Sequence, residues 1–156
     1  LVGSSTDGAG FIASLAEIGV DVADAHVAVI GAGAAARSVI DALGRAGTAD
    51  ITVLNRSAER AEQAAQLAAA ASVGADRDVT RADIVVNATS VGMGVAPSAA
   101  GASDLPCAVE LLRPEQVVVD LVYHPLRTAW LAAAESVGAR TVDGLGMLIH
   151  QAALQQ

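Results

Sequence analysis

The 156-residue sequence predicts an α/β fold with a doubly wound parallel sheet. Short runs rich in β-branched residues alternate along the chain with segments that favour helix, and this alternation is typical of parallel sheets. A glycine-rich turn joins the first apolar run, residues 27–30, to a helix-favouring segment at residues 34–45. Hydrophobic residues make up 53% of the chain but aromatic residues only 2%. We therefore expect a core of small aliphatic side chains, which suits close packing of helices on strands.

Each expected element is an apolar run or an amphipathic segment bounded by turn-forming residues or helix caps. The first helix, for example, has Phe11, Leu15 and Ile18 at helical spacing and ends at Gly19. The strands are expected at residues 27–30, 51–54, 73–75, 83–87, 117–121 and 140–142, and the helices at residues 8–18, 34–45, 58–70, 128–137 and 145–155. Residues 88–108 are expected to form a long loop, which is unusual inside a compact domain and is therefore a candidate functional segment.

Composition argues against several classes of function. The formal net charge is −8 with no basic cluster, which disfavours a nucleic-acid partner or an anionic membrane surface. No apolar run reaches the ~18 residues of a membrane span, and the single cysteine, Cys107, fits a reducing cytoplasm. The three histidines show no metal-ligand spacing, so we expect no metal site. All nine basic residues are arginine, so this chain cannot by itself complete a mechanism that needs lysine.

The glycine-rich turn has the residue types of a dinucleotide-binding loop, Gly-x-Gly-x-x-Ala. Gly31 permits the tight turn, Gly33 lets the backbone approach a pyrophosphate, and Ala36 allows close helix-on-strand packing, with Ala32 and Ala35 completing the loop. Such a string also occurs without a ligand. Here, however, it follows a strand, opens a helix and is followed by a second strand. We therefore predict a Rossmann-type dinucleotide-binding domain with a phosphate site at the helix N-terminus.

The residues after the second strand bear on the choice of cofactor. Asn55, Arg56 and Ser57 stand where an NAD-type fold usually has an acid for the ribose hydroxyl. A neutral amide followed by a guanidinium suits a 2′-phosphate instead, and Arg60 could add a second contact or stack on the adenine. NADP is therefore the predicted cofactor. The alternative is a helix start capped by Ser57, with both arginines simply exposed.

Two further strand ends carry small polar groups at the expected ligand edge of the sheet. These are the stretches Asn87 to Met93 and Asp120 to Pro125. Their hydroxyls and backbone groups could line a nicotinamide pocket, with a tyrosine as a flat wall. The alternative is ordinary turn chemistry, in which Asn87 and Asp120 bond the backbone. The candidate cofactor-binding residues of these stretches are Thr89, Ser90, Leu121 and Tyr123.

Taken together, six motifs carry a resemblance that spans nearly the whole chain. They are Thr6-Asp7-Gly8, Gly31 to Arg37, Asn55 to Ala61, Asn87 to Met93, Asp120-x-x-Tyr123-x-Pro125-x-x-Thr128, and Asp143-Gly144-x-Gly146-Met147-Leu148-x-x-Gln151-Ala152. The sequence resembles the C-terminal, NADP-binding half of shikimate dehydrogenases and their quinate/shikimate relatives. That resemblance implies reduction of 3-dehydroshikimate to shikimate with NADPH, a step toward aromatic amino acids in the cytoplasm.

The resemblance also implies roles for individual residues. Asp7 would contact the substrate and act with a partner lysine, Gln151 and Tyr123 would also touch substrate, and Tyr123 and Gly144 would lie near the nicotinamide. The sequence departs from the family pattern because it has no lysine, and because Ser5 stands where Asn is usual.

The departures imply a particular organisation of the chain. We expect residues 1–24 to be a hinge segment and interdomain helix, and residues 25–156 to be the NADP-binding domain, with the substrate domain missing. Such a fragment should lack activity alone. Two alternatives stay open: a non-catalytic NADP(H)-binding module, and a quinate-type dehydrogenase that uses NAD.

Overall fold

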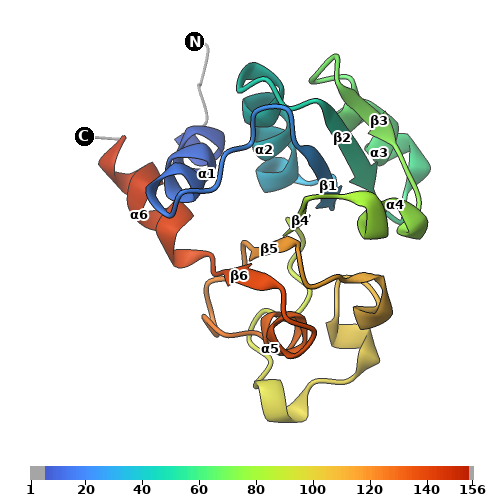
Figure 1. Ribbon diagram of the computed structural model, residues 1–156, viewed down its shortest axis with the longest axis vertical. Coiled ribbons are helices and arrows are strands. Elements are labelled where there is room, and N and C mark those ends of the chain that lie inside the picture. The colour runs from blue at the N-terminus through green and yellow to red at the C-terminus, as the bar shows by residue number, and fades with distance from the viewer. Residues whose placement is uncertain (1–5, 155–156) are drawn as a thin grey trace.

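The computed structural model describes residues 6–154 and contains a six-stranded parallel sheet. The strand order is β3-β2-β1-β4-β5-β6, so the sheet grows outward in both directions from the β1–β4 pair (Figure 1). This confirms the predicted doubly wound α/β class, in which ligands bind beyond the carboxyl ends of the strands where the order reverses. The strands are β1 (His26–Ile30), β2 (Asp50–Leu54), β3 (Ala71–Val73), β4 (Ile84–Asn87), β5 (Val117–Asp120) and β6 (Arg140–Val142).

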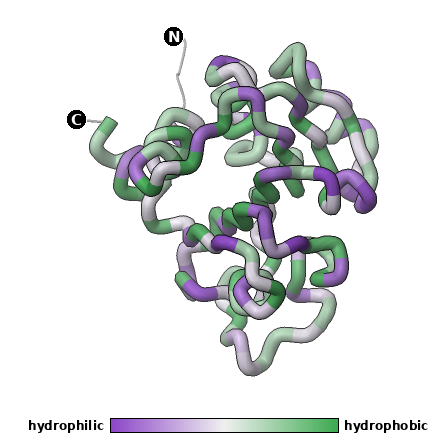
Figure 2. Tube along the Cα trace, viewed as in Figure 1, coloured by the Kyte–Doolittle hydropathy of each residue, from purple (hydrophilic) through white to green (hydrophobic). Residues whose placement is uncertain are grey.

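In the central strands β1, β4 and β5, alternate side chains enter two separate cores. In β1, Val27 and Val29 pack in the first core, whereas Ala28 and Ile30 pack in the second. Helices α1 (Thr6–Glu17), α2 (Ala34–Arg45), α3 (Ala58–Ala65) and α6 (Leu145–Ala153) contribute to the first core, and α4 (Asp76–Arg81) and α5 (Ala129–Ser136) to the second. Hydrophobic residues accordingly concentrate along the central strands (Figure 2). Each helix within residues 6–154 is too short or too polar to cross a bilayer.

The edge strand β3 lies two residues before its predicted position at 73–75. Its register is determined by pairing with β2, where Ile51 lies opposite Ala71. Gly74 follows the strand, and the position requires glycine because a Cβ there would lie 2.0 Å from the methyl group of Thr52. The preceding helix was expected over residues 58–70 but ends at Ala65. The chain needs the remaining residues to return to the edge of β2.

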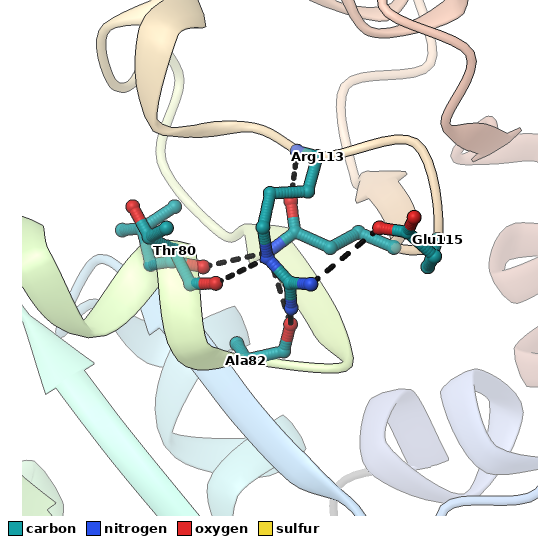
Figure 3. Close-up of polar contacts among 6 residues, drawn as sticks. Thr80, Ala82, Arg113 and Glu115 are labelled. Carbon is teal, nitrogen blue, oxygen red and sulfur yellow. Dashed lines mark hydrogen bonds and ion pairs between the residues drawn. The ribbon is translucent and has the colours of Figure 1, made fainter.

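Helix α4 lies between β3 and β4, where sequence analysis expected no element. Its C-terminal carbonyls are bound by side chains that precede β5 (Figure 3). Arg113 donates to the carbonyls of Thr80 (2.5 Å) and Ala82 (3.3 Å), and Gln116 donates to those of Val79 (2.7 Å) and Ala82 (2.9 Å). A six-residue helix is marginal alone, and these contacts from more than thirty residues away stabilise it.

The remaining differences concern the predicted loop and the chain ends. The loop expected at residues 88–108 contains two short 3₁₀ turns, Pro97–Ala99 and Ala102–Asp104, and a third turn follows at Val109–Leu111. The first five residues of the predicted hinge segment, and Gln155 at the end of the predicted last helix, lie outside the described residues.

Candidate functional site

The two glycines of the turn after β1 have different structural environments. Gly31 is buried, has φ +119°, and donates its N–H to Leu54 O at 2.7 Å. A Cβ at Gly31 would lie 2.8 Å from the carbonyl oxygen of Ala88. The close approach of the segments that follow β1 and β4 therefore requires glycine at position 31. Gly33 has φ −79°, and a Cβ there would meet nothing within 4 Å. The chain itself therefore gives no reason for glycine at position 33.

Helix α2 begins without a side-chain cap. Its N-cap is Gly33, which has no side chain to accept from the first-turn N–H groups, and the first turn contains no acidic residue. The N–H groups of this turn are thus available to a ligand, and the helix dipole favours an anion there. Ala36 is fully buried in the first core, which gives the close helix-on-strand contact expected from its size.

An open groove of about 540 Å³ lies beside this helix start. Its walls come from the glycine-rich turn, from α2 and from α3. The lining residues are Ala32, Gly33, Ala34, Arg37, Ser38, Arg60 and Gln63. A smaller hollow of about 330 Å³ lies near the opposite ends of β1 and β2, but its lining includes the carboxylates of Asp50 and Asp78, which disfavour an anion.

The residues after β2 combine a structural role with exposed positive charge. Asn55 donates its side-chain N–H to Ser57 O at 3.0 Å, and Ser57 caps α3 by accepting from the N–H of Arg60 at 3.4 Å. The predicted helix cap is therefore present. Arg56 is exposed, and Arg60 faces the groove. Within residues 6–154, neither guanidinium forms an ion pair.

A buried network joins the ends of β4 and β5. Asn87 and Asp120 are fully buried and lie opposite each other in the sheet register. The Asn87 amide donates to Asp120 Oδ1 at 2.9 Å and to Val91 O at 3.2 Å, while its oxygen accepts from the N–H (3.0 Å) and hydroxyl (2.6 Å) of Thr89. Asp120 also accepts from the N–H of Val122 at 3.0 Å. These contacts match the turn chemistry considered as the alternative.

The carboxylate of Asp120 is stabilised by three donors but remains costly to ionise. Besides Asn87 and Val122, the hydroxyl of Thr128 donates to Oδ2 at 2.7 Å and in turn caps α5. Burial raises the pKa of Asp120 above its usual value, and these hydrogen bonds oppose that rise. Both oxygens of Asp120 thus accept hydrogen bonds from the protein itself, and these bonds hold the segments that follow β4 and β5 in position.

The other residues predicted for the nicotinamide side lie around this network. Thr89 is half-buried and accepts from the N–H of Val91 at 3.1 Å, whereas Ser90 is exposed. Leu121 is half-buried and Tyr123 is 52% exposed, so its ring is accessible. Gly144 packs against the backbone of the segment that follows β5, since a Cβ at this glycine would lie 2.6 Å from Leu121 O. The structure therefore brings these positions from β4, β5 and α6 to one region.

Two of the three residues predicted to contact substrate, Asp7 and Gln151, lie on neighbouring helices, α1 and α6 (Figure 1). Asp7 is in the first turn of α1, and Gln151 is in α6; both are half-buried. The helices approach closely at Gly10, where a Cβ would lie 2.8 Å from the backbone nitrogen of Gln151. Close packing of α1 on α6 thus determines where both side chains are presented.

Four residues of the groove were not among the predicted site residues: Ala34, Arg37, Ser38 and Gln63. Arg37 and Ser38 follow the glycine motif, and Gln63 follows Arg60 by one turn of α3. Only the packing of α2 beside α3 shows that they share a groove. No group of three potential metal ligands occurs in the part of the chain between Thr6 and Leu154.

Comparison with known proteins identifies the family. The profile for Shikimate / quinate 5-dehydrogenase matches residues 14–121, more than half of the chain. The chain belongs to this family. Its resemblance to shikimate dehydrogenases, recognised from the motifs above, is thereby confirmed.

Individual relatives extend the match along nearly the whole chain. A shikimate dehydrogenase (NADP(+)) from Sphingopyxis alaskensis is 44% identical over 161 residues, covering 99% of this chain and 54% of the relative. The Thermus thermophilus shikimate 5-dehydrogenase, solved with NADP(H) and shikimate, has a TM-score of 0.84 at 37% identity, covering 96% and 54%. A ligand-free 5-ketofructose reductase from Gluconobacter has a TM-score of 0.80 at 38% identity, covering 96% and 55%. The chain spans about half the length of the relatives it matches.

Proposed function

We propose that the chain is the NADP-binding part of a cytoplasmic, shikimate dehydrogenase-like oxidoreductase. The observation that carries this proposal is the uncapped start of α2 at Gly33, which opens on a groove lined by Arg37 and Arg60. A helix start without a cap, beside cations, fits a phosphate-bearing ligand. Family membership and the NADP-dependent relatives support the same cofactor.

The residues present fit such a cofactor along its whole length. The open space above Gly33 leaves room for a pyrophosphate, and the side chains after β2 can hold the adenosine phosphate. The accessible ring of Tyr123 can pack on the nicotinamide. When bound, NADPH supplies the hydride. The residues proposed to hold it are Gly31, Ala32, Gly33, Ala35, Ala36, Asn55, Arg56, Ser57, Arg60, Thr89, Ser90, Leu121, Tyr123 and Gly144.

The proposed reaction interconverts 3-dehydroshikimate and shikimate, on the route to aromatic amino acids. Asp7, Gln151 and Tyr123 are the proposed substrate contacts on this side of the cleft, with Asp7 accepting hydrogen bonds from hydroxyl groups. Helix α6 exposes an apolar stripe, Leu145, Leu148 and Ile149, that suits cover by the substrate domain. Quinate is the second candidate substrate, because the matching family includes both activities.

The chain alone should bind NADP(H) but not turn shikimate over at an enzymatic rate. Positioning of the reactants contributes about 7–11 kcal/mol to catalysis, and this half offers one wall of a substrate cleft and no lysine. The measurement is NADPH formation, followed by nicotinamide absorbance, with saturating shikimate and then quinate on protein free of host dehydrogenase. Turnover that persists through purification and disappears in Asp7→Asn would refute inactivity of the fragment.

The same chain should prefer NADP over NAD. A charge-assisted contact contributes about 1.5–3 kcal/mol, so Arg56→Ala should weaken NADP binding roughly tenfold to a hundredfold. Arg77→Ala is the matched control, since Arg77 is also exposed but lies on α4. Both cofactors are titrated against all three proteins. Equal affinity of the wild type for NADP and NAD would refute the preference. Binding of NADP by a parent protein that lacks a substrate domain would instead favour the non-catalytic module.

A further inference from the structure

A single carboxylate binds both ends of the segment that joins β5 to α5. Residues 121–128 form neither helix nor strand, and they carry the accessible ring of Tyr123. At the start of this segment, the N–H of Val122 donates to Asp120 Oδ1 at 3.0 Å. At its end, the hydroxyl of Thr128 donates to Oδ2 of the same carboxylate at 2.7 Å. The two oxygens of Asp120 thus close residues 121–128 into a loop with fixed ends.

The ends of this loop are buried, whereas the aromatic side chain that it carries is not. Val122 and Thr128 are almost fully buried, but Tyr123 is 52% exposed. The backbone beyond Tyr123 is held as well, because the carbonyl of His124 accepts from the N–H of Gly94 at 2.8 Å. The backbone is therefore fixed on both sides of an exposed ring, which limits the directions that the ring can take.

The same carboxylate connects this loop to the segment that follows β4. Asn87 donates to Asp120 Oδ1 at 2.9 Å, and its own side-chain oxygen accepts from the N–H and the hydroxyl of Thr89. Thr89 and Tyr123 are both proposed to contact the nicotinamide side of the cofactor. Asn87 and Asp120 are fully buried, so neither offers a surface to a cofactor. Asp120 can therefore act on a cofactor only through the residues that it holds.

We propose that Asp120 is a positioning residue for the nicotinamide half of the bound cofactor, and that it fixes the direction in which the ring of Tyr123 faces the nicotinamide. This inference rests on the proposed function. The side-chain bonds that Asp120 accepts come from Asn87, Val122 and Thr128, beyond β4 and β5. The adenosine half is assigned to the groove between α2 and α3, beyond β1 and β2. Loss of the Asp120 contacts should therefore weaken binding of one half of the cofactor and not of the other, because a contact that is no longer preorganised must be ordered on binding.

The first test is calorimetric titration of two ligands, NADP and adenosine 2′,5′-bisphosphate. The second ligand has the adenosine end of NADP but lacks the nicotinamide. Asp120→Asn keeps the shape of the side chain but puts an amide in place of one acceptor oxygen. It should weaken NADP binding about tenfold and change binding of the bisphosphate less than about twofold.

Thr128 offers a matched pair of variants for the same contact. Thr128→Val has nearly the same shape but lacks the hydroxyl that donates to Asp120, whereas Thr128→Ser retains a hydroxyl. Thr128→Val should weaken NADP binding about threefold to tenfold, again with little change for the bisphosphate. Thr128→Ser should restore NADP binding to within about twofold of the wild type.

A control variant separates positioning from a general loss of stability. Gln116 is buried just before β5, at the end of the strand opposite to Asp120, and donates to the carbonyls of Val79 and Ala82. Gln116→Leu removes these buried bonds and should lower the melting temperature. It should nevertheless leave the affinity for both ligands within about twofold of the wild type.

The second test observes the ring itself. Tyr123 is the one tyrosine of the chain, so NMR signals of protein with isotope-labelled tyrosine rings report on this side chain alone. In the wild type, NADP should shift these signals and the bisphosphate should not. In Asp120→Asn the signals should broaden or split, because the ring takes several directions, and the shift on addition of NADP should be smaller.

Other outcomes overturn the proposal in distinguishable ways. Equal loss of both ligands in Asp120→Asn would indicate general disruption, and unchanged NADP affinity would leave Asp120 no positioning role. Weaker NADP binding with unchanged Tyr123 signals would assign the effect to another group. In each case wild-type binding of NADP would leave the proposed function intact, whereas a wild type that binds no NADP would refute both. Thermal melting checks the fold of each variant, and if Asp120→Asn does not fold, the Thr128→Val and Thr128→Ser pair decides.

Discussion

Two regions at the carboxyl edge of the sheet differ in how their polar groups are used. Beyond β1 and β2, the first-turn N–H groups of α2 have no side-chain cap and the groove arginines make no ion pair within residues 6–154. Beyond β4 and β5, Asn87 and Asp120 are buried and bonded to each other and to their own loops. Both regions follow buried strands and both carry polar motifs. The first leaves its groups available to a ligand, and the second uses them to hold loops in position.

The largest expected effect separates binding from folding within one motif. Gly33→Val should weaken NADP binding by about a hundredfold or more, ~2.7 kcal/mol, yet leave stability nearly unchanged. The reason is that position 33 has a φ any residue adopts and a Cβ there meets nothing. Gly31→Val should do the reverse and destabilise the fold, given φ +119° and the contact with Ala88 O. Titration and urea unfolding of both variants measure this. Wild-type NADP affinity in folded Gly33→Val would show that the turn is not the phosphate site.

The second prediction concerns the region that holds the loops. Asp120→Ala should lower the free energy of unfolding by about 2–4 kcal/mol, because each buried donor left without a partner costs about 1–3 kcal/mol. Asn87, Val122 and Thr128 would all lose an acceptor. Urea unfolding measures the loss, and Glu110→Ala, an exposed carboxylate, is the control. A loss no larger than that of the control would mean that the network does not stabilise the fold.

The smallest expected effect is a pH dependence of the free energy of unfolding that arises from the Asp120 carboxylate. Burial raises the folded-state pKa of Asp120 above its unfolded value, so the folded state binds the proton more tightly. Its contribution to stability is therefore fully present below the unfolded pKa, about 4, and is lost as pH rises through the higher folded value. Relative to Asp120→Asn, the wild type should gain stability on acidification from neutral pH. Unfolding curves of both proteins across that range test the sign, and a relative loss on acidification would contradict it.

Sequence patterns were sufficient for the features that depend on local chemistry. The glycine-rich turn, the Ser57 cap and the alternation of strands and helices each arise from neighbouring residues. The register of β3 and the existence of α4 depend on distant partners, namely β2 for the first and Arg113 with Gln116 for the second. Periodicity within one segment carries no information about such partners.

The candidate site shows the same division. The residues of the glycine turn were recognisable from their spacing, but Arg37 is identified only because α2 packs beside α3. Asn87 and Asp120 were recognised as polar strand ends. Their direct hydrogen bond follows from the parallel register of β4 and β5, which places them opposite each other. Sequence alone could not distinguish a ligand contact from a bond between these two loops.

The packing of α1 against α6 has a consequence for local unfolding. Three contacts join segments more than 120 residues apart: Gly10 with Gln151, Glu17 with His150 at 2.8 Å, and the carbonyl of Ile18 with Arg140. Neither helix can separate from the domain without breaking contacts to the other. In hydrogen exchange, amides of the first and last helices should therefore open together as one cooperative unit, although they are synthesised at opposite ends of the chain.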